Sequence, residues 1–237
     1  MHQNNGIDYP PLKAFKSGDN ASPRLRKVCN YASRLLLQGV QVADAIEILE
    51  LCSNVRDLAI WGLHFGTDHE HPSHRLAQAI YSLSLQRLSS NLVECQSLES
   101  LAFDSFSFHH LPFLTHIDTF GLLNAVLWDA LPHILSIPSL THMAMSAKHG
   151  KDPVIFALKE KPSLLLIIKT YLAALDDLDG GEDADYMEDS RVVQIHMCEL
   201  SKPGIAWVGD ELWIAGEKKR REKEKKLNHM RNSDFIL

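Results

Sequence analysis

The chain has 237 residues, of which 45% are hydrophobic and 23% are charged, and its formal net charge is −6 at pH 7. These proportions fit a folded globular protein and exclude wholesale disorder, collagen and a disulfide miniprotein. No apolar run reaches the roughly 18 residues of a membrane-spanning helix, and the polar start has no apolar signal core. We therefore expect no membrane contact and a cytoplasmic location.

The charge is concentrated in two segments. Residues 176–189 hold eight acids and no base, whereas 218–226 hold seven bases and two acids. The rest of the chain is nearly balanced, so it lacks the basic surface that nucleic-acid binding needs. The four cysteines are far apart in sequence, which fits a reducing compartment.

In chain order, residues 1–23 read as an irregular lead-in with three prolines and little periodicity. From Arg24 onward the chain is predicted to be helical. Within that region Val42, Ala45, Ile46 and Leu49 fall at helical spacing.

A short apolar motif then recurs along the chain. Its first copy is Val55-x-x-Leu58-x-Ile60, and later copies begin at Leu85, Leu114, Leu140, Leu164 and Val192. An extra copy begins at Leu98. Successive first positions lie 24 to 30 residues apart. Ser90 and Lys169 are polar residues at positions that the motif places in the core.

Stretches that can be helical separate the copies, at 73–82, 124–136, 154–160 and 171–178. A strand plus a helix at this period is typical of leucine-rich repeats. The predicted fold is therefore α/β, an irregular leucine-rich-repeat-like solenoid over 24–215 with parallel strands and outer helices. The alternative is an ordinary α/β domain with leucine-rich strands.

The C-terminal part is predicted to hold an insertion, a cap and a charged tail. The acidic segment 176–189 reads as a flexible insertion before the last strand. Trp207, Leu212 and Trp213 would close the open end of the core, as terminal repeats do. Residues 216–237 then form a charged helix and tail, in which KKRR at 218–221 offers an alternative nuclear address.

Alternation along each strand predicts one set of side chains on the solvent face of the sheet. We expect this set to bind a protein partner, with Trp61, Arg87 and Phe120 as anchors because arginine and aromatic residues dominate interfaces. Its members are Asp57, Trp61, Arg87, His116, Asp118, Phe120, His142, Gln194 and His196. His116 and His142 hold equivalent positions in adjacent copies, so we expect them side by side about 4.8 Å apart.

Four histidines gather in one predicted loop: His64, His69, His71 and His74. With the nearby carboxylates they suggest an alternative function, a metal-binding protein or a metal-dependent enzyme that uses the loop 64–74, since imidazoles bind zinc, copper or nickel. The two histidines four apart on a helix that mark a zinc protease are missing. No phosphate-binding glycine loop or nucleophile–base pair is evident, so we expect no catalysis and no cofactor.

Several phrases carry a family resemblance: ELCSNVRDLAIW at 50–61, LPFLTHID at 111–118, IPSLTHMAM at 137–145, DSRVVQIHM at 189–197 and WVGDELWIAGEKKRR at 207–221. Over residues 24–222 the chain resembles the leucine-rich-repeat-like region of F-box-type proteins of mushroom-forming fungi. The resemblance implies substrate recognition in a cullin ubiquitin ligase, whose adaptor binds the F-box helices. Residues 1–40 are too short and too polar for a complete F-box, so we expect a free-standing or truncated recognition module with an unknown protein partner.

Overall fold

The computed structural model describes residues 29–64, 72–91, 108–119, 124–146, 152–171, 189–196, 200 and 210–233. The strands in these ranges are β1 (Arg34–Gln38), β2 (Asp57–Trp61), β3 (Arg87–Asn91), β4 (His116–Asp118), β5 (His142–Ser146), β6 (Leu166–Tyr171) and β7 (Val192–His196). The helices are α2 (Val42–Leu51), α3 (Pro72–Tyr81), α4 (Asn124–Leu135), α5 (Asp152–Glu160) and α7 (Glu211–Ser233), with a 3-10 turn η4 (Phe108–His110).

The strands form one open sheet in the order β1-β2-β3-β4-β5-β6-β7, and every pair is parallel. Neighbours in the chain are therefore neighbours in the sheet. Helices α2, α3, α4 and α5 lie in the connections between successive strands. The α/β prediction with a parallel sheet is confirmed.

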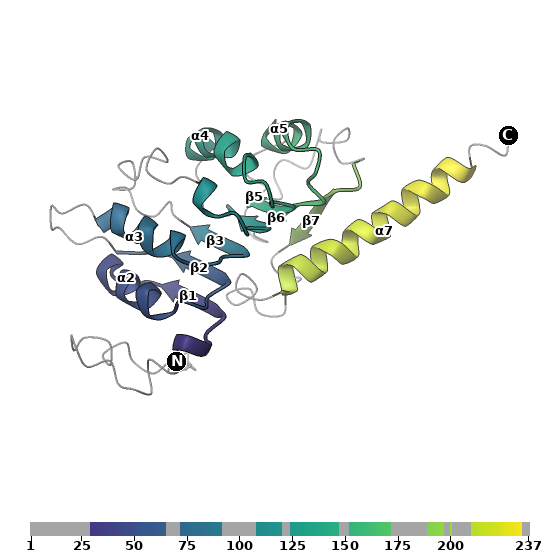
Figure 1. Ribbon diagram of the computed structural model, residues 1–237. Coiled ribbons are helices and arrows are strands. Elements are labelled where there is room, and N and C mark those ends of the chain that lie inside the picture. Colours follow the sequence, from purple (N-terminus) through teal and green to yellow (C-terminus); the bar gives the residue numbers. More distant parts are fainter. Residues whose placement is uncertain are drawn as a thin grey trace, which may run out of the picture.

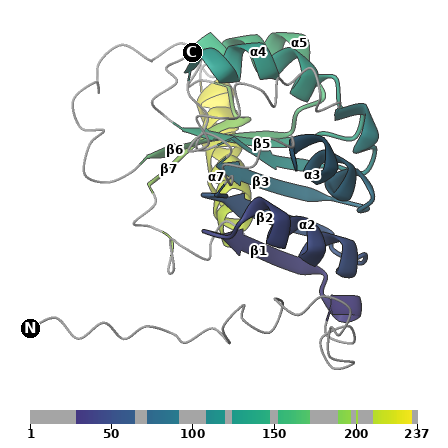
Figure 2. The same ribbon diagram turned by 90° about the vertical axis from the view of Figure 1, so that its left-hand side faces the viewer.

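Two layers of helix lie on opposite faces of this sheet (Figures 1 and 2). Helices α2–α5 cover one face and bury the main core, which includes Leu58, Ile117 and Met143 from the strands. Helix α7 lies on the other face and contributes to a smaller, separate cluster. The helices predicted around 42–49, 73–82, 124–136 and 154–160 match α2 to α5 closely.

In five copies of the motif, the first residue turns into the core just before its strand. These residues are at most 1% exposed: Val55, Leu85, Leu114, Leu140 and Leu164. Beside them runs a ladder in which one carbonyl accepts two backbone N–H groups of the next unit. Its acceptors are Ser33, Arg56, Gln86, Thr115 and Thr141. The copies thus share one backbone geometry as well as one sequence pattern.

Two glycines mark equivalent positions at the ends of β1 and β2. Gly39 has φ +62° and Gly62 has φ +56°, a left-handed conformation that residues with a Cβ rarely adopt. The Gly39 N–H donates to the Trp61 carbonyl, at 3.0 Å. Glycine at both positions lets the first two units leave their strands by the same turn.

The structure corrects three expectations. Residues 34–38 form strand β1, although the chain was expected to be helical from Arg24. Strand β7 pairs Val192 with Ile167, so Val192 and not Ile195 faces the main core. Helix α7 begins at Glu211, and it covers a face of the sheet where a cap at the end of the core was expected.

Other sequence predictions have mixed outcomes. Lys169 occupies a core position as expected and is only 1% exposed. The extra motif copy at Leu98, most of the predicted helix 171–178 and most of the acidic segment 176–189 lie outside the described residues, as does Trp207. Within the described part of the chain, no helix is both long enough and apolar enough to cross a bilayer.

Candidate functional site

The sheet face opposite α2–α5 brings five polar residues into one row at the start of the strands. Strand register places Arg34 beside Asp57, Asp57 beside Arg87, Arg87 beside His116, and His116 beside His142. We call these five residues the strand-start row. Because β1–β5 are consecutive and parallel, the five residues lie along a single line, although they are spread over the sequence from Arg34 to His142.

The row begins with an ionic cluster that reaches across to the start of α7. Arg34 Nε lies 3.2 Å from Asp57 Oδ2, and Arg87 Nη1 lies 3.8 Å from that same oxygen. Asp210, just before α7, accepts hydrogen bonds from Arg34 Nη2 at 2.9 Å and from Arg87 Nη1. Two guanidinium groups and two carboxylates therefore join three strands to α7.

The two carboxylates of this cluster differ in their electrostatics. Burial raises the pKa of Asp57, and the charges of Arg87 and Arg34 offset only part of that effect. Hydrogen bonds from Arg87 and Arg34 lower the pKa of Asp210, which is more exposed. Asp210 is thus the carboxylate that the two arginines hold ionised.

The row continues with a stacked pair of imidazoles. The His116 and His142 ring centroids lie 4.1 Å apart and the rings are inclined by 12°. Trp213 of α7 meets His116 edge-on at 4.8 Å. Thr115 Oγ1 and Thr141 Oγ1 lie 2.8 and 2.7 Å from the Nδ1 atoms of their neighbouring histidines. The predicted side-by-side placement is confirmed, but α7 covers the pair.

Burial governs the protonation of both imidazoles. It lowers the pKa of His116 to about 3, with a further contribution from the neighbouring His142 and Arg87. Burial also lowers the pKa of His142, although a 3.3 Å contact from its Nε2 to Glu217 Oε1 opposes the shift. Burial therefore favours the neutral form of both rings.

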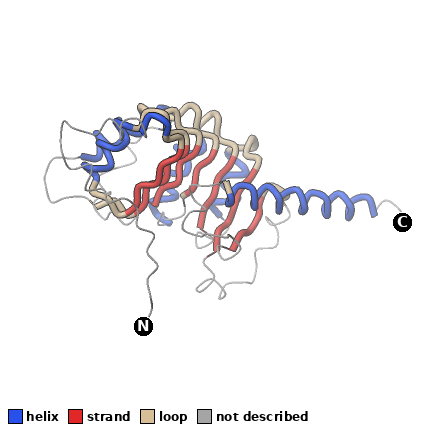
Figure 3. Tube along the Cα trace, turned by 90° about the horizontal axis from the view of Figure 1, so that it is seen from below, coloured by secondary structure: helices blue, strands red, loops and turns tan. Residues whose placement is uncertain are grey.

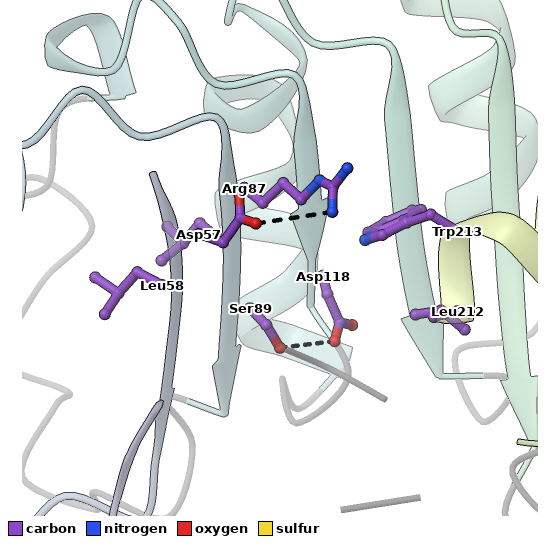
Figure 4. A pocket seen from close by; sticks show the side chains of 8 residues that line it. Asp57, Leu58, Arg87, Ser89, Asp118, Leu212 and Trp213 are labelled. Atoms are coloured by element: carbon purple, nitrogen blue, oxygen red, sulfur yellow. Dashed lines mark hydrogen bonds and ion pairs between the residues drawn. The ribbon is translucent and has the colours of Figure 1, made fainter. Parts of the chain in front are cut away.

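A small hollow adjoins the row, lined by polar and apolar residues of β2–β4 and by Leu212 and Trp213 of α7 (Figure 4). Ser89 Oγ donates to Asp118 Oδ2 at 2.9 Å, and Trp61 Nε1 donates to Ser89 Oγ at 3.4 Å. Asp118 is only 3% exposed. A hydroxyl and a carboxylate thus face the sheet side of α7 from within the hollow.

Helix α7 lies close to the sheet because of Gly216. A Cβ at this position would come within 2.6 Å of Ile168 Cδ1 and 3.0 Å of Leu166 Cδ2. Further along the helix, Lys219 Nζ donates to the Gln194 carbonyl at 2.9 Å, and Lys223 Nζ donates to the Val192 carbonyl at 2.9 Å. These contacts fix α7 against β6 and β7.

The predicted partner-binding residues separate into three groups. The structure brings together Asp57, Trp61, Arg87, His116, Asp118 and His142 on one sheet face. Gln194 and His196 lie on the opposite face, because register pairs them with Lys169 and Tyr171. Phe120 lies outside the described residues.

The expectation that this face is open to solvent is wrong at its centre. Asp118 is buried and His142 is largely covered, because α7 lies over this part of the sheet. Trp61 is partly buried at the margin of the α7 cluster. The accessible part of the face is therefore nearer β1 and β2, where Arg34 and Gln38 are exposed.

The predicted histidine loop is described only at its ends. His64 is exposed and forms an isolated parallel bridge with Gln41, and His74 is exposed on α3. His69 and His71 lie outside the described residues. Among the described residues, no three metal-ligating side chains form a group that could hold an ion.

Sequence reasoning missed Arg34, Asp210 and Glu217. Arg34 was assigned to a helix, and Asp210 lies 176 residues from it in the chain. A scan against protein-family models and a search of curated proteins find no match to this chain. The resemblance to F-box-type proteins accordingly stays a prediction. The geometry itself places charged, aromatic and hydrogen-bonding groups on one sheet face.

Proposed function

We propose that this chain is a non-catalytic protein-recognition module, built as an irregular leucine-rich-repeat-like solenoid. The strand order follows the chain order without interruption, and the same carbonyl ladder links successive units. Both features support repeated strand–helix units that stack on their neighbours. In such an array the strand face offers one side chain of each unit at the same height.

The observation that carries this proposal is the strand-start row. It places two arginines, an aspartate and two stacked imidazoles along one line of the sheet, with its Arg34 end exposed and its imidazole end under α7. Arginine and aromatic groups supply most of the binding energy at protein interfaces. Trp61 lies on this same face and is only partly buried, so it is an accessible anchor beside the row.

We further propose, from the family resemblance, that the bound protein is a substrate of a ubiquitin ligase. Contact with the cullin adaptor is the weaker part of this proposal. The proposed location is the cytoplasm, with the nucleus as the alternative. Within the KKRR stretch, Lys219 and Arg220 already contact Gln194 and Glu217. Because two of the four bases of this alternative nuclear address are engaged within the protein, we favour the cytoplasm.

Affinity capture with matched tryptophan variants tests the proposal. The full-length tagged chain, its Trp61→Ala variant and its Trp128→Ala variant are incubated with lysate of the native cell. Trp128 is a comparable control because it is 40% exposed on α4, on the helix-covered side of the sheet. We expect a partner that Trp61→Ala loses by at least about tenfold and that Trp128→Ala retains.

The opposite pattern would move the binding surface to the outer helices. Capture that neither variant alters would contradict recognition through the strand face. Recovery of the cullin adaptor together with a second protein would place the module in a ubiquitin ligase, and a single partner without the adaptor would make it free-standing.

A further inference from the structure

Helix α7 is attached to the sheet independently of the main core. The main hydrophobic cluster draws on α2–α5 and on the strands, and it includes no residue of α7. The buried residues Leu212 and Trp213 of α7 belong instead to the smaller cluster over β5–β7. Removing α7 from its place would therefore leave the main core closed.

The contacts that hold α7 are partly apolar and partly polar, and the polar ones at the start of the helix are accessible to water. Asp210 and its partner Arg34 have side chains 37% and 48% exposed, and the Glu217 side chain is 25% exposed. Exposed ion pairs contribute little net stability because solvent and salt screen them. The polar half of this attachment can thus be exchanged for equivalent groups on another helix.

The sheet face below α7 nevertheless needs a cover. It carries an apolar patch formed by Ala144, Leu166, Ile168, Val193 and Ile195, all of them buried. Such a patch left open to water would be costly, because burying apolar surface drives protein association. An amphipathic helix is the cover that this face accepts, and α7 shows the chemistry that fits it.

We propose that the α7 docking face is the binding site for an amphipathic helix of the partner protein, and that α7 is its displaceable intramolecular occupant. This inference rests on the proposed recognition function and names the partner's chemistry. The occupant presents a carboxylate to Arg34 and Arg87, a large aromatic ring to the His116–His142 pair, and a second carboxylate to His142.

The spacing of these groups defines the partner helix. In α7 they are Asp210, Trp213 and Glu217, three and four residues apart, so they fall on one side of a helix. A small residue must precede the second carboxylate, as Gly216 does, because the helix there touches Ile168. The partner thus carries an acidic residue, an aromatic residue three positions later, and a small residue followed by an acidic one.

Displacement requires competition with a tethered helix. Because α7 belongs to the same chain, its effective concentration at its own site is on the order of millimolar. A free helix therefore binds weakly while α7 is in place, and more strongly once α7 is lifted. Figure 3 shows that the C-terminal part of α7 extends beyond the sheet, so a partner can approach the helix from that end.

Lifting α7 tests this inference. Gly216→Leu in the full-length chain introduces a side chain against β6, whereas Lys218→Leu adds the same side chain at an exposed position of the same helix. The probe is a fluorescent peptide of residues 210–233, followed by anisotropy. We expect the peptide to bind Gly216→Leu at least tenfold more tightly than wild type, and Lys218→Leu to behave as wild type. A peptide carrying D210N, W213A and E217Q should lose that binding.

Equal affinity of the peptide for wild type and Gly216→Leu, or equal binding of the two peptides, would overturn the inference. Stable dimers of Gly216→Leu that excess peptide does not dissociate would assign the face to a second copy of the chain. Hydrogen exchange checks the fold, and if β2–β5 lose protection in Gly216→Leu, Trp213→Ala replaces it with the same expected gain. Because the peptide assay uses no lysate, its failure is separate from a failure of the Trp61 capture experiment.

Discussion

His116 and His142 stack face to face on adjacent strands, and the edge of Trp213 closes over them. Protonating both of two imidazoles at van der Waals distance is unfavourable because their charges repel, and burial disfavours even one charge. The protonation of these two imidazoles is therefore coupled, through their contact with Trp213, to the attachment of α7.

Stability should decrease in mild acid because of this pair. The pKa of His116 falls from about 6.5 in the unfolded chain to about 3 in the folded protein. Between these values the unfolded chain binds the extra proton, so the free energy of unfolding falls as the pH falls. A single group of this kind contributes at most about 1.4 kcal/mol per pH unit. Urea unfolding at pH 7.5, 6 and 5 measures it, and His116→Asn should show a shallower decrease than wild type. Parallel curves for the two proteins would contradict the link.

The buried carboxylate of Asp118 should contribute to stability. Asp118→Ala removes the acceptor of the Ser89 hydroxyl and leaves that hydroxyl in a buried hollow. We expect the free energy of unfolding to fall by about 1–3 kcal/mol, the usual cost of an unsatisfied buried group. Asp129→Ala, at an exposed position of α4, is the matched control and should change it by no more than about 0.5 kcal/mol. Equal effects in thermal or urea unfolding would be evidence against this role.

The repeating part of the fold could be predicted because its signals are local. The apolar motif gave the strands β2–β6, and the spacing between copies gave the helices α2–α5. Equivalent positions in adjacent copies also placed His116 beside His142. In each case a side chain's place depends on residues within one or two units of the repeat.

The incorrect predictions have physical causes in contacts between different strand–helix units. The segment RLLLQ of β1 contains good helix formers, and only pairing with β2 makes it a strand. The apolar motif can be aligned to β7 in two ways, beginning at Val192 or at Asp189. The second alignment is correct, and it places the polar residues Asp189 and Gln194 at positions where the motif has apolar residues. Asp210 meets Arg34 and Arg87 across 176 and 123 residues, a distance over which sequence periodicity carries no signal.

The buried ammonium of Lys161 should stabilise the end of α4. Its Nζ donates to the carbonyls of Leu135 and Ile137 at 3.1 and 2.6 Å, and burial lowers its pKa. Lys161→Met keeps the chain length but leaves two carbonyls without this donor, so we expect a loss of about 1–3 kcal/mol. Lys159→Met, on the exposed side of α5, serves as the comparison in urea unfolding. A Lys161→Met protein as stable as Lys159→Met would show that water replaces the donor.

The lysines of α7 should keep the edge strand β7 from pairing with other chains. Lys219 and Lys223 donate to the carbonyls of Gln194 and Val192, which are backbone acceptors of the strand at the end of the sheet order. Open edge strands recruit further strands, and lysines are a common protection against this. Replacing both lysines with alanine should therefore increase aggregation on gentle heating, measured by light scattering. Lys218→Ala with Lys225→Ala removes the same charge from exposed positions and should leave the onset of scattering close to that of wild type. If the two double variants aggregate alike, the effect comes from net charge, and the carbonyl contacts have no protective role.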